Sequence, residues 1–228
     1  MSDSLLALGA RELGLELNPE NLTNLELFMH EMARWNQVHN LTAIEGGGDS
    51  VRLHLIDSIA ILPIMRQFLK GTTPKIADLG SGGGLPAIPI AILQPYWQLT
   101  LIEAIRKKTA FLQHVRGKLK LQNIEVLSAR VENAAMQHLG QFDGVISRAF
   151  TNLARFLDLS LPFLKPDGLV FAMKARRADE ELEDVCMDHW RLVADEPVYI
   201  PNLAAERRLL VFAPVRKSPS HPISKATS

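Results

Sequence analysis

The segment ADLGSGGGLPAIPI, residues 77–90, joins an acidic residue to a run of closely spaced glycines. Its spacing is Asp-x-Gly-x-Gly-x-Gly, formed by Asp78, Gly80, Gly82 and Gly84. Because glycine has no Cβ, this backbone can adopt positive φ angles and can lie directly against a ligand. When such a turn precedes a helix, the positive end of the helix dipole faces the same space. The residue types therefore indicate a binding site for a polar or anionic small molecule.

Two prolines decide where the helix after these glycines begins. Proline is tolerated in the first turn of a helix but breaks a helix interior. Pro86 and Pro89 can therefore share one helix only if that helix begins at about Leu85 or Pro86. The glycines then form a turn between a strand and a helix. We expect the backbone amides of this turn to point at no other group of the protein, which leaves them available to a ligand.

Glu103 indicates which ligand this is. It ends the next β-rich run, 19 residues after Gly84, where a carboxylate can accept hydrogen bonds from both hydroxyls of a ribose. The pyrophosphate fingerprint G-x-G-x-x-G/A also matches, at residues 82–87, but its helix-packing position then follows a proline directly. The spacing resembles instead the first motif of Rossmann-like S-adenosylmethionine (SAM) methyltransferases, which favours SAM over NAD. A glycine loop that serves only close packing is the remaining alternative.

Short β-rich runs alternate with helices from Lys75 onward, and this alternation predicts a parallel sheet with right-handed crossovers. The expected strands are residues 75–80, 98–103, 124–129, 142–149, 168–174, 197–201 and 207–214. Helices are expected between them, for example over residues 106–119 and 153–164. The last two strands, separated by a short loop, are expected to form an antiparallel hairpin. We therefore predict an α/β fold.

The residues before this alternation are expected to form a helical extension. Asn18 and Pro19 are typical of a helix start, because a capping residue is followed by proline at the first helical position. A second apolar helix is expected from Val51 to Leu69. The expected division of the chain is residues 1–70 for the extension, 71–214 for the core and 215–228 for a disordered tail.

Charge is balanced overall but uneven along the chain. The 25 Lys and Arg residues equal the 25 Asp and Glu residues, which argues against a strongly basic nucleic-acid binder. Residues 1–100 hold 6 basic and 10 acidic residues, however, whereas residues 101–228 hold 19 and 15. Basic clusters at residues 106–108, 116–120, 174–177 and 207–208 leave room for a polyanionic partner on one face. For any one cluster alone, solvated helix ends and loops are the simpler explanation.

Other features bear on the compartment and on metals. The N-terminus lacks the basic segment and apolar run of a signal peptide, and no apolar run approaches the roughly 18 residues that indicate a membrane span. The single cysteine, Cys186, excludes an intramolecular disulfide and a multi-cysteine metal site. No histidine spacing typical of a metal site occurs. We therefore expect a cytoplasmic protein that binds neither membrane nor metal.

Six segments in a fixed order resemble the bacterial small-subunit ribosomal RNA methyltransferase G family (RsmG, also called GidB). They are WNQVHNLTAI at 35–44, HLIDS at 54–58, DLGSGGGLPAIPIAI at 78–92, SARVE at 128–132, FDGVISRAF at 142–150 and ERRLLVF at 206–212. The resemblance implies a Rossmann-like class I core with a seven-stranded, mostly parallel sheet, helices on both faces and a helical N-terminal extension. It also implies methyl transfer from SAM to N7 of a guanine in the 530 loop of 16S ribosomal RNA (position 527 in the family's convention), within naked RNA or a small-subunit particle.

The same resemblance implies roles for individual residues. The implied cofactor-binding residues are Gly80, Gly82, Gly84, Leu85, Glu103, Ala104, Val131, Glu132 and Arg148. Glu103 and Ala104 would lie at the ribose and adenine, and Val131 and Glu132 at the adenine edge. Arg148 would face the methionine end of the cofactor and the substrate pocket. The chain departs from the family pattern at Leu53, where a basic residue is common, and at Ala87 and Ala175, where glycine is common.

The implied chemistry requires no general base, because guanine N7 carries a lone pair that is free at neutral pH. Methyl transfer is an in-line displacement, to which an enzyme contributes mainly positioning. Since the methylated purine gains positive charge, we expect hydrogen-bond donors at guanine O6 and at phosphates rather than at N7. Arg148 is the candidate catalytic residue, and Lys174 and Arg207 are candidate substrate-binding residues. For Lys174 and Arg207, ordinary solvation at a strand end remains the alternative.

Three further possibilities stay open from the sequence. His54 and Asp57, one helical turn apart, could be ligands or a proton relay, but a polar clasp that holds their helix on the core is favoured, with Asn40 and Thr42 capping nearby. An NAD(P)-linked oxidoreductase could use the same loop, although no tyrosine precedes a lysine by four residues. A non-catalytic RNA-binding assembly factor could retain the fold.

Overall fold

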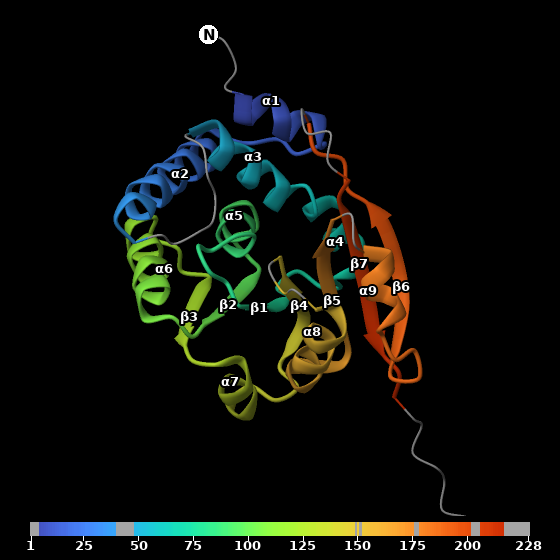
Figure 1. Cartoon of the computed structure of the whole chain (residues 1–228). Coiled ribbons are helices and arrows are strands. Elements are labelled where there is room, and N and C mark those ends of the chain that lie inside the picture. Colours follow the sequence, from blue (N-terminus) through green and yellow to red (C-terminus); the bar gives the residue numbers. More distant parts are fainter. Residues whose placement is uncertain are drawn as a thin grey trace, which may run out of the picture.

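A seven-stranded sheet with the strand order β3-β2-β1-β4-β5-β7-β6 forms the centre of the computed structural model (Figure 1). The structure describes residues 5–39, 48–148, 150, 152–175, 178–201 and 206–216. The strands are β1 Lys75–Leu79, β2 Gln98–Glu103, β3 Ile124–Ser128, β4 Phe142–Ser147, β5 Leu164–Lys174, β6 Trp190–Pro197 and β7 Arg208–Pro214. Strands β1 to β5 pair in parallel, and β7 runs antiparallel to both β5 and β6. The predicted α/β fold, with its mostly parallel sheet and closing hairpin, is confirmed.

Helices cover both faces of this sheet. They are α1 Leu5–Glu12, α2 Pro19–His39, α3 Gly48–Ile59, α4 Leu62–Phe68, α5 Ala87–Leu93, α6 Arg106–Lys118, α7 Val131–Gln137, α8 Leu153–Ser160 and α9 Ala178–Glu183, with a 3-10 turn over Leu161–Phe163. Helices α1 to α6 lie over one face, whereas α7, α8 and α9 lie over the other (Figure 1). None of the helices in these described ranges is long and apolar enough to cross a membrane.

The first strand of the hairpin was predicted wrongly. It was expected at residues 197–201 but spans Trp190–Pro197, with only the amide of Val198 continuing the pairing, to the carbonyl of Arg207 at 2.7 Å. Strand β6 lies at the edge of the sheet, and only Trp190 in it is buried. An edge strand exposed on this scale lacks the apolar alternation that identifies a half-buried strand.

Of two predictions about the N-terminal helices, one is confirmed and one is wrong. The start of α2 is confirmed, because Oδ1 of Asn18 accepts a hydrogen bond from the amide of Asn21 at 2.7 Å. The single helix expected over residues 51–69 is wrong, because the chain forms α3 and α4 with a break around Ile61. Pro63 lies in the first turn of α4, where a helix does not use its backbone N–H. Inside one long helix its ring would instead clash with the preceding turn, so the chain forms two helices.

The core consists of two apolar clusters, one on each face of the sheet. Successive residues of β7 alternate between them: Leu209 packs in the first cluster and Leu210 in the second. Helices α1 to α4 contribute to the first cluster, for example through Phe28 and Leu55, both of which are fully buried. The N-terminal helices thus share a core with the sheet. Of the tail expected to be disordered, residues 217–228 lie outside the described ranges, and the amide of Val215 donates to the carbonyl of His189 at 2.8 Å.

Candidate active site

The residues predicted to bind the cofactor all follow the carboxyl ends of four neighbouring strands. The glycine loop and Leu85 follow β1, Glu103 ends β2 and Ala104 follows it, Val131 and Glu132 begin α7 after β3, and Arg148 follows β4. In the strand order, β2 and β3 lie on one side of β1, and β4 and the later strands lie on the other. Ligands of open α/β sheets bind at such a switch point, beyond the carboxyl ends of the strands. The fold therefore brings these segments to one edge of the sheet.

Within the glycine loop, Gly82 and Gly84 have different surroundings. Both adopt positive φ angles, of 56° and 84°. A Cβ on Gly84 would lie only 2.5 Å from Cγ1 of Ile88 in α5, so this glycine is required for the helix to approach the loop. A Cβ on Gly82 would meet only the carbonyl oxygen of Gly80, at 3.8 Å. Close packing thus accounts for Gly84, whereas Gly82 leaves space that a ligand can use.

The expectation that the loop amides have no protein partner is wrong. The amides of Gly80 and Ser81 donate to the carbonyl oxygen of Ile102, at 2.9 and 3.2 Å. The amide of Gly82 donates to Oε2 of Glu103 at 2.9 Å. The reason lies in the sheet: β2 runs parallel to β1, and its last residues place acceptors directly beside the loop. Sequence spacing alone does not contain this contact between neighbouring strands.

Glu103 is the acceptor that links the loop to the next segment. Its side chain is buried, with 7% of the residue exposed, and its Oε1 accepts a second hydrogen bond, from the amide of Ile105 at 2.8 Å. A carboxylate has about four lone-pair sites, so two amide bonds hold Glu103 in place and leave acceptor capacity for hydroxyl groups. The pairing of an oriented carboxylate with open space at Gly82 fits the ribose and methionine parts of SAM.

Asp78, the first residue of the motif, is an unusual carboxyl group. It is 1% exposed, and in the described part of the protein its Oδ2 has no hydrogen-bond partner. Burial raises the pKa of Asp78 to about 8, and the charge of nearby Glu103 acts in the same direction. Asp78 therefore holds its proton to a higher pH than an ordinary aspartate does.

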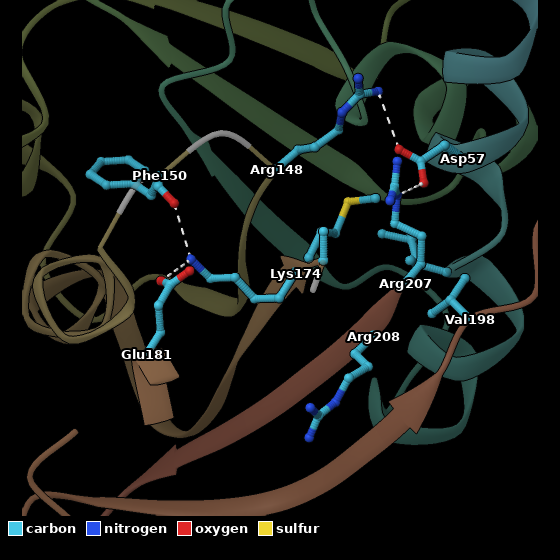
Figure 2. Close-up of a pocket in the computed structure, with 11 residues that line it drawn as sticks. Asp57, Arg148, Phe150, Lys174, Glu181, Val198, Arg207 and Arg208 are labelled. Atoms are coloured by element: carbon cyan, nitrogen blue, oxygen red, sulfur yellow. Dashed lines mark hydrogen bonds and ion pairs between the residues drawn. The ribbon is translucent and has the colours of Figure 1, made fainter. Parts of the chain in front are cut away.

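A cavity of about 270 Å³ lies at the ends of β4 and β5 (Figure 2). Its polar and aromatic lining comes from α3, the segment after β4, the end of β5, α9 and the chain around the start of β7; the residues are Asp57, Arg148, Phe150, Lys174, Glu181, Arg207 and Arg208. Phe150 connects the cavity to the glycine loop, because it lines the cavity and a Cβ on Gly80 would lie 3.5 Å from Cε2 of its ring. The three residues predicted to act on the substrate, Arg148, Lys174 and Arg207, are thus brought together.

Asp57 joins two of these three cations. Nε of Arg207 donates to its Oδ1 at 3.1 Å, and Nη1 of Arg148 lies 3.6 Å from its Oδ2. Figure 2 shows both guanidinium groups directed at this carboxylate. His54 binds Arg148 as well, through Nδ1 at 2.7 Å from Nη2 and through its carbonyl oxygen at 3.2 Å from Nη1. The polar clasp between α3 and the core is confirmed, while Asn40 and Thr42 lie outside the described residues.

The imidazole of His54 acts as an acceptor in this clasp. Burial lowers the pKa of His54, and the positive charge of Arg148 lowers it further, against an opposing effect of Asp57. A neutral ring can accept at Nδ1 while its proton is on Nε2, which is the form that the guanidinium of Arg148 requires.

Lys174 is held on the opposite side of the cavity. Its ammonium group donates to Oε2 of Glu181 at 2.6 Å and to the carbonyl oxygen of Phe150 at 3.0 Å. Glu181 also accepts from the amide of Leu153 at 3.0 Å, so it ties α9 to the start of α8. The sequence analysis did not single out Glu181, because it stands in the acid-rich stretch ADEELE, which reads as a solvated helix. Phe150 was quoted only as part of a family segment.

Arg208 lines the cavity but its charged group is turned away from it (Figure 2). Its guanidinium binds Asp179 at 2.6 Å and both oxygens of Asp195 on β6. Among the described residues, no group of three or more His, Cys, Asp or Glu side chains could hold a metal ion.

This fold is that of Rossmann-like class I SAM-dependent methyltransferases. It is similar to a SAM-dependent methyltransferase from Aquifex aeolicus, with a TM-score of 0.53 and 15% identity over 71% of this chain and 92% of that chain. It is also similar to Pyrococcus horikoshii TYW2 in complex with MeSAdo, with a TM-score of 0.51 and 12% identity over 71% of this chain and 61% of that chain.

The family model for rRNA small subunit methyltransferase G, GidB, matches residues 21–211. The chain is 74% identical over 219 residues to the ribosomal RNA small subunit methyltransferase G of Polynucleobacter asymbioticus, which covers 96% of this chain and 99% of the relative. It is 39% identical to the protein of the same name from Bordetella avium, over 88% of both chains. The chain therefore belongs to the rRNA small subunit methyltransferase G family, and membership favours a methyltransferase over the oxidoreductase and the non-catalytic assembly factor.

Proposed function

We propose that this protein transfers a methyl group from SAM to N7 of a guanine in the 530 loop of 16S ribosomal RNA, in the cytoplasm. Its substrate is naked RNA or a small-subunit particle. The observation that carries the proposal is the position of the Arg148 cavity, because Phe150, which lines it, also lies against Gly80 of the glycine loop. A methyl donor in the loop and an acceptor base in the cavity would then be neighbours. Family membership supplies the ribosomal RNA substrate class.

The cofactor would be held by segments from four strand ends. Glu103, oriented by the amides of Gly82 and Ile105, would accept from the ribose hydroxyls. Val131 and Glu132 at the start of α7 would face the adenine. The fold neighbours support SAM, because one is described as SAM-dependent and another was solved with MeSAdo. When bound, SAM supplies a methyl group on a positively charged sulfur, which is already activated for displacement.

The protein's own contribution is positioning. A base held about 3–3.5 Å from the methyl group in line with the breaking bond gains roughly 7–11 kcal/mol over reactants free in solution. No general base is required, since guanine N7 is unprotonated at neutral pH. Arg148 is the proposed catalytic residue: its guanidinium lines the cavity and would donate to guanine O6. Arg207 and Lys174 would support the same base or its phosphates.

The test is to map N7-methylguanine in 16S RNA from cells that lack this protein. Reduction and aniline cleavage break RNA at N7-methylguanine, so the site is read as a strand break. We expect one break in the 530 loop of wild-type RNA, its loss in the deletion strain, its return with the intact gene and no return with Arg148→Ala. An unchanged break pattern in the deletion strain would refute the proposal.

A further inference from the structure

We propose that Asp57 is a positioning residue of the acceptor cavity, which holds Arg148 and Arg207 in the arrangement that the acceptor base requires. The inference rests on the proposed function, in which the cavity holds the acceptor guanine. Asp57 comes from α3 in the N-terminal helices, Arg148 from the segment after β4, and Arg207 from the residue before β7. One carboxylate therefore aligns cations that lie 91 and 150 residues further along the chain.

The contacts of Asp57 divide its two oxygens between the two arginines. Oδ1 accepts from Nε of Arg207 at 3.1 Å, and Oδ2 lies 3.6 Å from Nη1 of Arg148. The carboxylate side chain is 6% exposed, whereas the guanidinium side chains are 26% and 21% exposed. All three side chains line the cavity, and the carboxylate is the most buried of them (Figure 2).

Arg207 keeps donors for a ligand in this arrangement. A guanidinium has five N–H groups in a fixed fork. The described hydrogen bonds of Arg207 are made by Nε to Asp57 and by Nη1 to the carbonyl of Glu206. Two positive charges against one negative charge leave this wall of the cavity electropositive, as expected for a site that binds guanine O6 or a phosphate oxygen.

Without Asp57, the two guanidinium groups would have no common acceptor and would repel each other. Burying a carboxylate is costly, and an apolar side chain of similar size at this position is often as stable or more stable. Stability alone therefore does not explain why residue 57 is an aspartate. An aspartate is explained if its carboxylate fixes the separation and orientation of two cations that contact the substrate.

The N-terminal helices contain a natural control for a purely structural role. Glu31 on α2 is 3% exposed, and its Oε2 lies 2.9 Å from Nε2 of His114 on α6. Like Asp57, it is a buried carboxylate that ties an N-terminal helix to the core through a cation-forming side chain. Unlike Asp57, it does not line the cavity.

The experiment compares Asp57→Asn with Glu31→Gln in the full chain. SAM affinity is measured by calorimetry, kcat and KM for 16S RNA methylation by transfer of labelled methyl, and Tm by thermal unfolding. We expect Tm to fall in both variants and SAM affinity to stay within about twofold in both. Only Asp57→Asn should lower kcat for RNA methylation, by at least tenfold. In an Arg207→Ala background the same substitution should cost clearly less, because Asp57 acts through that arginine.

If Asp57→Asn fails to fold, Asp57→Glu replaces it. That variant keeps the charge but moves both arginines, so we expect unchanged Tm with a lowered kcat. Equal losses of kcat in the Glu31 and Asp57 variants would show a structural role and overturn the inference. Parallel loss of SAM affinity, or full kcat in the folded Asp57 variants, would overturn it too. A wild-type protein that binds SAM but methylates no RNA would instead refute the proposed function.

Discussion

The ammonium group of Lys174 lies 2.6 Å from Oε2 of Glu181, and both side chains line the cavity at the ends of β4 and β5. The Lys174 side chain is only 7% exposed. Its charge is therefore neutralised within the protein, and so is the charge of Arg208 by Asp179 and Asp195, whereas Arg207 shares Asp57 with Arg148. The described basic residues of the clusters at 174–177 and 207–208 thus form ion pairs within the protein. An RNA backbone is therefore expected to bind mainly to another basic surface.

We expect Glu181→Gln to destabilise the protein by about 3 kcal/mol. The substitution leaves the Lys174 ammonium buried without its counter-charge, and breaking a buried pair from one side costs roughly 3–5 kcal/mol. Chemical denaturation measures the change. Asp184→Asn, an exposed acidic residue shortly after α9, is the control and should alter stability by less than about 0.5 kcal/mol. Similar stabilities of the two variants would contradict the importance of the ion pair.

Glu103→Ala should weaken SAM binding. Each charge-assisted hydrogen bond contributes about 1.5–3 kcal/mol, so two ribose contacts correspond to a loss of at least about a hundredfold in affinity. Calorimetry with SAM and with NADH provides the measurement. Glu125→Ala removes an exposed carboxylate from the adjacent strand β3 and should leave affinity unchanged. Unchanged SAM affinity in Glu103→Ala, or tighter binding of NADH than of SAM by the wild type, would count against the cofactor assignment.

Substitutions at Gly82 and Gly84 should fail for different reasons. Gly84→Val introduces a Cβ that overlaps Ile88, so we expect a large fall in Tm. Gly82→Val meets no close neighbour in the protein, and we expect a folded variant, with a modest cost for its positive φ, that has lost SAM binding. Thermal unfolding and calorimetry on both variants separate the two effects. Normal methylation by Gly82→Val would mean that the loop serves packing alone.

The start of α6 is the basic surface that we expect to contact RNA phosphates. Its first turn carries Arg106 and Lys108 and no acidic residue, although the helix dipole favours acidic residues there. Reversing both charges to Glu should lower RNA affinity and reduce the slope of log affinity against log salt by about 2, since each phosphate contact contributes roughly 0.9. SAM affinity should be unaffected.

Reversal of Arg116 and Lys118, at the other end of the same helix, is the matched control for that experiment. It changes the net charge equally, at the end of the helix that does not follow the cofactor-binding edge of β2. Filter binding across a salt series measures both double variants. Equal losses in the two would indicate only a general charge effect, and no loss in either would place the RNA surface elsewhere.

Asp78 should make stability fall as pH rises. Its folded-state pKa of about 8 lies above the ordinary value of 3.8, so between these values the folded protein holds a proton that the unfolded chain has released. The contribution of Asp78 is therefore present below about pH 4 and is progressively lost toward pH 8. Asp78→Asn, which cannot titrate, should remove this component. Free energies of unfolding at pH 5, 6, 7 and 8 provide the test, and an identical pH dependence in the two proteins would contradict the raised pKa.

Much of the fold followed from patterns that are local in the sequence. The spacing of glycines and prolines located the turn between β1 and α5, because φ restrictions and missing N–H groups act on neighbouring residues. Short β-rich runs located β1 to β4, of which β1, β2 and β4 are almost continuously buried. The same pattern was weak in β6, where an edge position leaves most side chains exposed. Glu103 was also identified locally, since it ends a strand at a fixed distance from the loop.

The tertiary structure alone decided the partners of the charged residues. The loop amide of Gly82 bonds to Glu103 because β2 lies against β1. Arg207 bonds to Asp57 because the fold brings α3 beside the residue that precedes β7, across 150 residues of chain. Charge and hydrogen-bonding capacity are properties of each residue type and can be read from the sequence. Which opposite charge each one meets depends on how helices and strands pack, and that packing is a property of the whole chain.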